Sequence, residues 1–199
     1  MSTAVSDPNP LMVAIPTHDS RTVVYTMIAL TQLGNLVPGG IHIITAEGGN
    51  IPRTRNLCMD IIRHNDPKPA DPCWVLWIDS DILVAPEMAP VIAEYINEAM
   101  VSHRPWLVNY NMADGRSTLM KDRTQYNARH YSTEELIALP DWAEVGMGGF
   151  GMAFLPMELG YQFKADISGE DIHYFLDHPD LTVHVAKKII LRHRKAVWV

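Results

Sequence analysis

Short, strongly apolar runs alternate with longer segments of helical periodicity through the first half of the chain. The apolar runs, each of a length typical of a buried strand, are residues 11–15, 41–45 and 73–78. The segments with apolar positions at helical spacing are residues 23–34, 52–62 and 87–100. Because strand and helix alternate in this way, the pattern predicts an α/β fold with a mostly parallel central sheet flanked by helices.

The first two predicted helices each have one side that is expected to face the sheet. In the first, which Asp19 or Ser20 can cap, the inward positions are Val23, Val24, Met27, Ile28 and Leu30. In the second, which begins at Pro52, they are Leu57, Cys58, Ile61 and Ile62. Arg55 lies one turn before Met59, so its side chain is predicted to lie near the apolar side and to point along the sheet toward the site.

The second half of the chain is less regular. Further strands are expected over residues 106–110, 152–155 and 182–192, with helices after the capping-box sequence 132–135 and from Glu170. No repeat, low-complexity tract or linker divides the chain. We therefore expect one domain over residues 11–199, preceded by a flexible arm of residues 1–10.

The composition fits a folded domain and limits what it can bind. Of the 199 residues 47% are hydrophobic, which is enough for one core and excludes disorder as the main state. The formal net charge of -7 argues against general binding to nucleic acid or anionic lipid. No apolar run reaches the roughly 18 residues that span a bilayer, and no signal-peptide pattern opens the chain, so a soluble, cytoplasmic protein is expected. Cys58 and Cys73 are expected to be reduced core side chains.

The clearest chemical signal is the triplet Asp79-Ser80-Asp81, which directly follows the most apolar run. The carboxyl ends of parallel strands share one edge of a sheet, so a site is expected there, with Thr17 and Glu47 after the neighbouring strands. Where the strand turns outward, both carboxylates can reach one hard divalent cation through oxygen. The alternative is that Asp79 only caps the loop and Asp81 is solvated.

With this triplet the chain resembles glycosyltransferases of the GT-A fold, of the family-2 type. In these enzymes a D-x-D motif after such a strand holds Mn²⁺ or Mg²⁺ against the diphosphate of a nucleotide sugar. Further motifs match in order: Ala14-Ile15-Pro16-Thr17, Pro52-Arg53-Thr54-Arg55-Asn56, Gly148-Gly149-Phe150-Gly151-Met152-Ala153-Phe154-Leu155, Gly169-Glu170-Asp171-Ile172 and a late His193. The resemblance implies a single Rossmann-like GT-A domain, with a nucleotide-binding half over residues 11–110 and an acceptor-side half over residues 111–199.

The resemblance also implies a set of metal ligands. Asp81 would bind the metal directly, and Asp79 would contact the ribose or reach the metal through water, with Ser80 in the same cofactor-binding loop. His193 resembles the third protein ligand, and His184 on the same segment is a competing candidate. Because Mn²⁺ accepts imidazole beside carboxylate more readily than Mg²⁺ does, this set favours Mn²⁺. A solvated histidine in a basic tail is the alternative for His193.

The acceptor side is predicted at Glu170-Asp171, which resembles the motif at the start of the acceptor-side helix. There a carboxylate of inverting enzymes takes the proton of the attacking hydroxyl, so Asp171 is the predicted catalytic base, with Glu170 beside it. The alternative is that two acids at a helix N-terminus simply complement the helix dipole.

Donor contacts are expected from the second helix and from the loops after the first two strands. The guanidinium of Arg55 is of the kind that pairs with a phosphate through two parallel hydrogen bonds. By the resemblance, Thr17, His18 and Asp19, together with Glu47, would frame the nucleoside.

Several other residues have two interpretations each. The glycine-rich stretch 146–151 lacks the setting of a phosphate loop, and its glycines either allow a sugar or acceptor to approach the backbone closely or form a bulged strand. Trp142 and Phe150 either stack on a sugar or belong to the core. Arg53 and Asn56, on the exposed side of the second helix, are either solvated or beside the nucleotide.

Together these residues predict a metal-dependent glycosyltransferase that moves a sugar from a nucleoside-diphosphate sugar to an acceptor hydroxyl. Three alternatives remain. A haloacid-dehalogenase-type phosphatase would use Asp79 as its nucleophile, and a nucleotidyltransferase would use Asp79 and Asp81. A non-catalytic GT-A-like protein would bind a sugar or nucleotide without turnover. The triplet follows the third strand, which argues against the phosphatase, and residues 16–19 contain no glycine, which argues against the nucleotidyltransferase.

Overall fold

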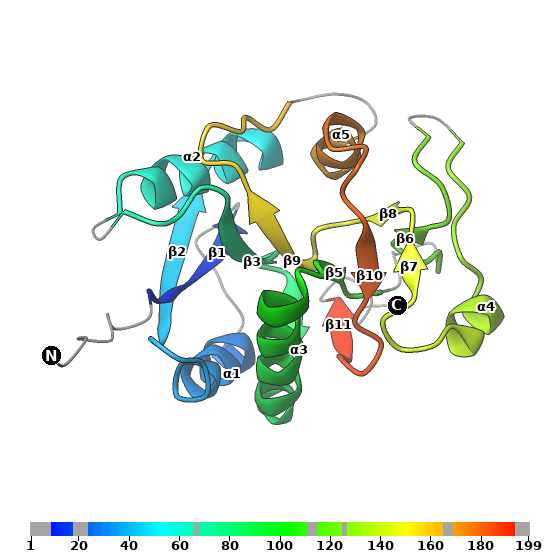
Figure 1. Cartoon of the computed structure of the whole chain (residues 1–199), viewed down its shortest axis with the longest axis horizontal. Coiled ribbons are helices and arrows are strands. Elements are labelled where there is room, and N and C mark those ends of the chain that lie inside the picture. The colour runs from blue at the N-terminus through cyan, green and yellow to red at the C-terminus, as the bar shows by residue number, and fades with distance from the viewer. Residues whose placement is uncertain are drawn as a thin grey trace, which may run out of the picture.

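The apolar runs form one central sheet in a computed structural model of the chain, which describes residues 9–17, 24–65, 68–110, 115–124, 127–164 and 169–193. The sheet has seven strands in the order β2-β1-β3-β9-β5-β10-β7 (Figure 1). Their bounds are β1 (Leu11–Thr17), β2 (Ile41–Glu47), β3 (Cys73–Ile78), β5 (Trp106–Leu107), β7 (Glu144–Val145), β9 (Met152–Met157) and β10 (Val183–Val185). β1 pairs in parallel with β2 and β3, and β10 pairs in parallel with β5. β9 and β7 run against their neighbours.

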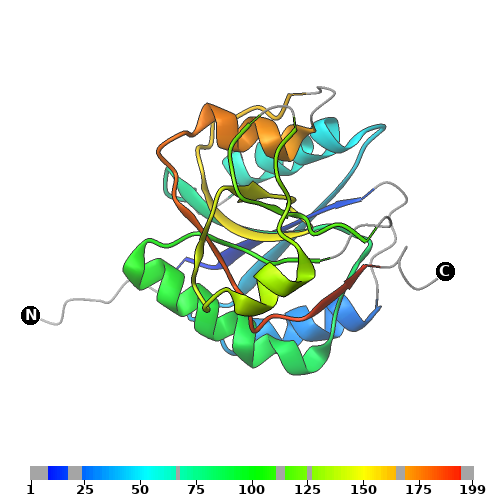
Figure 2. The ribbon, with the colours of Figure 1, turned by 90° about the vertical axis from the view of Figure 1, so that its right-hand side faces the viewer.

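Helices cover both faces of this sheet. They are α1 (Val24–Gly34), α2 (Ile51–Arg63), α3 (Ala89–Ser102), α4 (Thr133–Ala138) and α5 (Glu170–Asp177), with a 3-10 turn η1 (Pro86–Met88) before α3. Figure 2 shows α2 and α5 on one face and α1 and α3 on the other. Each pair closes its own hydrophobic core cluster against the sheet. The predicted α/β class, with a mostly parallel central sheet flanked by helices, is confirmed, and the arrangement is compatible with a single Rossmann-like domain.

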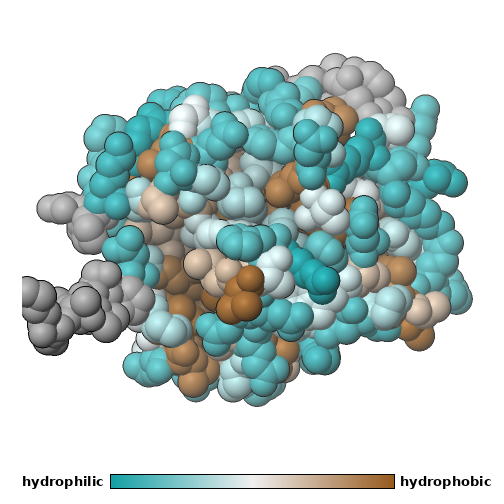
Figure 3. Space-filling model, in the orientation of Figure 1, coloured by the Kyte–Doolittle hydropathy of each residue, from teal (hydrophilic) through white to brown (hydrophobic). Residues whose placement is uncertain are grey.

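The buried side of α1 differs from the predicted one. Its buried residues are Thr26, Ala29, Leu30 and Leu33, whereas Val24, Met27 and Ile28 are 71%, 36% and 43% exposed. Thr26 faces inward because its hydroxyl donates to the Ile82 carbonyl at 3.0 Å and accepts from the Val84 N–H at 3.1 Å. A satisfied threonine therefore takes the inner position, and apolar side chains remain on the surface (Figure 3). Residues 18–23, with the predicted caps and Val23, lie outside the described residues.

The buried side of α2 was predicted in part. Cys58 and Ile62 are buried as expected, but Leu57 and Ile61 are 36% and 45% exposed. Asn50 caps this helix through its side chain, and Pro52 lies in the first turn as predicted. The buried side is rotated from the predicted one because it includes Thr54, Arg55 and Met59. The helix thus places the charged side chain of Arg55 inward, as its spacing from Met59 predicts.

The single last strand predicted over residues 182–192 is two strands that belong to different sheets. β10 joins the central sheet, and β11 (Leu191–His193) pairs antiparallel with β4 (Ile82–Val84). A turn closed by the Ile189 N–H and the Ala186 carbonyl, 3.4 Å apart, separates them. A further two-stranded sheet joins β6 (Leu119–Met120) to β8 (Met147–Gly148). The predicted strand 106–110 is shorter than expected, because β5 ends at Leu107.

Two local predictions are confirmed. The capping box of Ser132 and Glu135 opens α4 with both of its hydrogen bonds. Cys58 and Cys73 are buried free thiols. In the part of the chain that the structure describes, no helix combines the length and the apolar character needed to cross a membrane.

Candidate functional site

The carboxyl ends of β1, β2 and β3 meet at one edge of the sheet, because these strands run parallel. Thr17 ends β1, is buried, and pairs in register with the exposed Glu47 that ends β2. Asp79 directly follows β3 and is half-buried. The structure therefore brings these three residues to the edge where the sequence places the site. His18 and Asp19 lie outside the described residues.

The Asp81 carboxylate lies beside an imidazole from the far end of the chain. Asp81 and Ser80 form the turn between β3 and β4, and the next residue, Ile82, pairs with His193 across β4 and β11. This pairing brings His193 Nε2 to 3.2 Å from Asp81 Oδ2. Of the two candidate histidines, His193 is the one at the acidic turn. His184 lies in β10, where its ring makes an edge-on contact with that of Trp142, with centroids 6.2 Å apart.

One buried guanidinium joins acidic residues of two distant segments. Arg55 extends inward from α2, and its side chain is only 1% exposed. Its Nη2 lies 3.0 Å from Asp79 Oδ1 and 3.4 Å from Asp171 Oδ1, and its Nε donates to Glu170 Oε1 at 3.2 Å. Three aromatic rings surround its Cζ, with centroids 5.3, 5.1 and 5.9 Å away in Trp77, Phe150 and Phe163. The side chain predicted to bind a phosphate is thus turned toward carboxylates and away from solvent.

The carboxylates around Arg55 together can carry more negative charge than its single positive charge offsets. Burial raises the pKa of Asp79, an effect that Arg55 opposes and that Asp81 and Glu170 reinforce. Burial likewise raises the pKa of Asp171, again opposed by Arg55 and reinforced by Glu170 and Asp79. A single guanidinium therefore leaves the carboxylates under mutual repulsion. A divalent cation would find a favourable potential at this edge.

Asp171 is held in the first turn of α5 from two sides. The Phe150 N–H donates to its Oδ2 at 3.0 Å, while its Oδ1 faces Arg55. Within the described residues Oδ1 is buried and accepts no hydrogen bond. The side chain as a whole is 23% exposed. Since a carboxylate oxygen has two lone pairs, Oδ2 keeps acceptor capacity beyond the bond from Phe150.

Tyr110 belongs to this site although no sequence pattern singles it out. Its ring stacks on that of His193, with centroids 5.6 Å apart and an interplanar angle of 1°. It also lies against the backbone of Gly151, where a Cβ would come within 2.1 Å of Tyr110 Cε1. Burial raises the pKa of Tyr110, and the charges of Asp79 and Asp171 reinforce this. Tyr110 follows a short strand and carries no motif, so only the fold reveals it.

This packing decides between the two interpretations of several aromatic and glycine residues. The close backbone approach that Gly151 allows is made by the Tyr110 ring. Phe150 is fully buried and belongs to the core around Arg55. Trp142 packs on Tyr95, with ring centroids 4.9 Å apart, away from the acidic turn.

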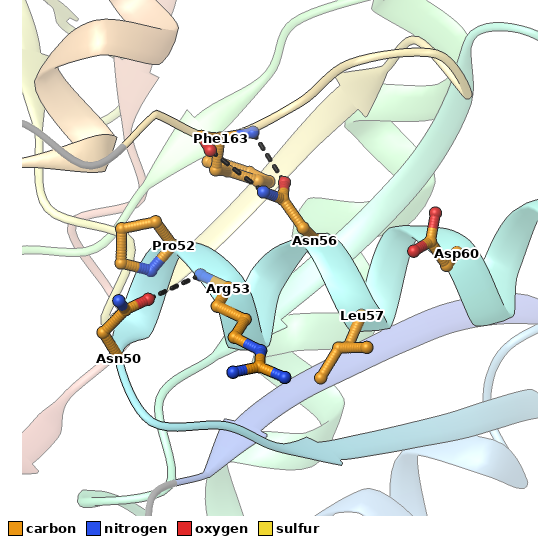
Figure 4. A pocket seen from close by; sticks show the side chains of 7 residues that line it. All are labelled: Asn50, Pro52, Arg53, Asn56, Leu57, Asp60 and Phe163. Carbon is orange, nitrogen blue, oxygen red and sulfur yellow. Dashed lines mark hydrogen bonds between the residues drawn. The ribbon is translucent and has the colours of Figure 1, made fainter.

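A pocket runs along the outer side of α2 (Figure 4). Its lining consists of Asn50, Pro52, Arg53, Asn56, Leu57, Asp60 and Phe163. The Asn56 side chain accepts the Phe163 N–H at 2.6 Å and donates to the Phe163 carbonyl at 3.0 Å. Asn56 therefore ties α2 to the segment after β9, whereas the exposed Arg53 side chain points away from Phe163 in this view.

The acidic turn fits Mn²⁺ or Mg²⁺ only as a cation that a ligand helps to hold. No three His, Cys, Asp or Glu side chains among the described residues are grouped closely enough to bind a metal ion on their own. Asp81 and His193 offer one carboxylate and one imidazole, while Asp79 directs Oδ1 to Arg55. Proteins commonly hold Mg²⁺ with one or two carboxylates together with substrate phosphates, and imidazole suits Mn²⁺ better. The donor set therefore fits a cation shared with a diphosphate.

Neither a scan against protein-family models nor a search of curated proteins gives a match to this chain. Its function is accordingly inferred from the site itself.

Proposed function

We propose that this protein is a metal-dependent glycosyltransferase that moves a sugar from a nucleoside-diphosphate sugar to the hydroxyl of an acceptor. One observation carries the proposal. Arg55 holds Asp79, next to the Asp81 and His193 pair, and Asp171, at the start of α5, on the same guanidinium nitrogen. A candidate cation site and a candidate base therefore lie on either side of one fixed point, as group transfer between two bound substrates requires.

The cation site consists of Asp81 and His193. Mn²⁺, or Mg²⁺ in its place, would offset the negative charge of the departing diphosphate when bound there. Asp79 lies beside this cation site. Arg55 pairs with its Oδ1, and its other oxygen is left for a ribose hydroxyl or a bound water. Thr17 and Glu47, at the ends of the two neighbouring strands, are proposed to contact the nucleoside.

In the transfer step Asp171 takes the proton of the acceptor hydroxyl. The acceptor oxygen forms a bond to the anomeric carbon while the bond from that carbon to the diphosphate oxygen breaks, and its electron pair leaves with the diphosphate. The acceptor proton passes to the Asp171 carboxylate. A raised pKa suits this role, because a general base works best when its pKa lies near the working pH. Glu170 acts on Asp171 indirectly, since it shares the Arg55 side chain.

The contacts of Asp79 favour a binding role over the phosphatase alternative. Asp79 Oδ1 is 3.0 Å from Arg55 Nη2, and the Asp79 N–H donates to the Gly151 carbonyl at 3.0 Å. One carboxylate oxygen is therefore already paired with a cation, which makes the carboxylate a weaker nucleophile. The other oxygen is the one proposed above to meet a ribose hydroxyl or a bound water.

The proposal is tested by following nucleoside-diphosphate release from UDP-, GDP- and dTDP-sugars with Mn²⁺. We expect Asp171→Asn to reduce release at least a hundredfold, because the base is lost, while metal-dependent donor binding stays within about twofold. Asp81→Ala should lose both. The matched control is Asp177→Asn on the same helix, which removes a surface pair with Lys164 and should leave both unchanged. If Asp171→Asn releases product at the wild-type rate, Asp171 is not the base.

A further inference from the structure

An apolar cavity of about 370 Å³ lies at the edge of the sheet opposite the acidic turn. Its lining includes the first residues of two neighbouring parallel strands, which are Leu11 and Met12 of β1 and Cys73 and Trp74 of β3. Both strands run from this cavity to the candidate functional site at their carboxyl ends. The cavity is therefore separate from that site, and we call it the amino-end cavity.

Other parts of its lining are held in place by rigid residues and backbone hydrogen bonds. Four lining residues are prolines, whose rings fix the backbone φ angle: Pro10, Pro38, Pro69 and Pro72. Next to Pro38, the Val37 N–H donates to the Leu33 carbonyl, and the Gly40 N–H donates to the Val37 carbonyl, each at 3.0 Å. The Leu159 N–H donates to Asp71 Oδ1 at 3.1 Å and so anchors the segment before β3. The cavity is thus preformed, which spares a ligand the cost of ordering its walls.

The amino-end cavity carries no charge on its lining. Charged residues make up 20% of the chain, yet none of the described residues that line the cavity is an acid, a lysine, an arginine or a histidine. The side-chain amides in the lining belong to Asn9 and Asn97, which are exposed. An ionised ligand would therefore lose hydration without gaining a counter-charge. An uncharged apolar ligand would instead replace water that finds few polar partners there.

The side chains of the lining favour a ring over a flexible chain. The half-buried Trp74 indole packs on the Phe154 ring, with centroids 4.9 Å apart, and is held in one orientation. Met12 and Met100 add two thioethers to the lining, and thioether sulfur makes favourable contacts with aromatic rings. Ligand pockets in proteins commonly have volumes of roughly 300–1,000 Å³, so the space suits a small molecule.

We propose that the amino-end cavity binds a small, uncharged aromatic molecule. This inference does not rest on the proposed function, because it involves neither the acidic turn nor Asp171.

The ligand class is tested with two fluorescent dyes that share one aromatic skeleton. Phenylnaphthylamine is uncharged at neutral pH, and anilinonaphthalene sulfonate adds a sulfonate to the same rings. We expect the uncharged dye to bind saturably, with one molecule per chain, in the absence of nucleotide and metal. The sulfonate should bind at least about tenfold more weakly, because its charge finds no partner in the lining. No saturable binding of the uncharged dye, or equal affinity for the two dyes, would overturn the proposal.

Two neighbouring residues at the end of α3 provide a matched pair of variants. Met100 lines the cavity, whereas Val101, which is 84% exposed, does not. Met100→Glu adds a carboxylate to the lining and should weaken binding of the uncharged dye at least about fivefold. Val101→Glu adds the same charge to the same turn and should keep the affinity within about twofold. Thermal unfolding checks that both variants fold, and equal affinity in the two would overturn the proposal.

The position of the dye is measured without a charged variant. In protein with ¹³C-labelled methionine methyl groups, the signals of Met100 and Met27 are identified by their loss in Met100→Leu and Met27→Leu. Saturating uncharged dye should shift the Met100 signal and leave that of Met27, which lies on α1 outside the lining. A shift of Met27 without a shift of Met100 would place the dye on exposed apolar surface and overturn the proposal.

Light scattering with and without the uncharged dye tests the other occupant that an apolar cavity could take. The mass in solution should be the same in both conditions. A dimer that the dye dissociates would assign the cavity to a second copy of the chain and overturn the proposal.

Discussion

At the scale of single residues, Arg55 determines how the acidic site is built. A guanidinium that is 1% exposed carries a large desolvation cost, which only close carboxylates and hydrogen bonds offset. Asp79 and Asp171 come from segments that are far apart in the chain, and both approach the same Nη2 atom. Their geometry therefore depends on one side chain. Replacing Arg55 therefore measures how much its charge contributes to the stability of the site.

Arg55→Met keeps the length of the side chain and removes its charge. We expect a loss of about 3 kcal/mol or more in the free energy of unfolding, because the partly buried carboxylates lose their cation. Arg53→Met, at an exposed position of the same helix, should cost about 0.5 kcal/mol or less. Urea unfolding at pH 7 with chelator measures both. Equal losses would mean that the buried cluster is not held by Arg55.

At the scale of elements, short segments decide which residues meet. β11 leaves the central sheet for β4 and so carries His193 to Asp81. The turn into β9 gives Gly151, against which the segment after β5 packs Tyr110. A strand end, a two-stranded sheet and a loop thus form one wall of the site. The stacking of Tyr110 on His193 depends on the backbone at Gly151 being bare.

Gly151→Ala should disrupt this wall. The added Cβ would lie 2.1 Å from Tyr110 Cε1 and 2.5 Å from Cζ, so the ring must move away from its place beside His193. We expect a cost of about 1–3 kcal/mol in the free energy of unfolding, typical of overpacking in a tight core. Gly160→Ala, whose added Cβ meets no atom within 4 Å, should change it by about 0.5 kcal/mol at most. Thermal unfolding of both variants checks this, and a Gly151→Ala protein as stable as the Gly160→Ala control would contradict the packing described.

At the scale of the whole molecule, the sequence predicts the architecture better than it predicts the side-chain contacts. Apolar runs and helical spacing are local signals, and they were sufficient for the α/β order and for the edge that gathers Thr17, Glu47 and Asp79. The inner face of α1 was mispredicted because Thr26 satisfies its hydroxyl within the fold, which hydrophobicity does not encode. The carboxylate contacts of Arg55 could not be predicted, because its partners are distant in the chain. Glu170, for example, is separated from Arg55 by 115 residues.

The concentration of acid at one edge also gives the whole molecule a pH dependence. The folded state raises the pKa of Asp171 above its ordinary value of 3.8, to about 8, so it binds this proton more tightly than the unfolded chain does. The stability from this group is complete below pH 3.8 and is lost as the pH rises toward 8, by at most about 1.4 kcal/mol per unit. Glu170, Asp79 and Arg55 are the charged groups that face it.

In the presence of chelator, the wild type should therefore lose more stability between pH 5.5 and pH 7.5 than Asp171→Asn does. Asp177→Asn is the control, because Lys164 lowers the pKa of Asp177 and its contribution is lost only as the pH falls below the ordinary carboxylate range. Urea unfolding at both pH values gives the difference. Parallel pH dependence in the wild type and Asp171→Asn would show that Asp171 carries no raised pKa.

The measurement that tests the central claim most directly is a thermal-shift panel of UDP, GDP, dTDP and their sugars, each with Mn²⁺, Mg²⁺ or chelator. We expect a stabilisation of the wild type that requires both a nucleotide and the metal, because in the proposed function Asp81 and His193 bind the cation only together with a diphosphate. The stabilisation should vanish in Asp81→Ala and remain in the surface variant Asp177→Asn. A folded wild type that responds to no combination of nucleotide and metal, or an Asp81→Ala variant that responds as the wild type does, would contradict the account.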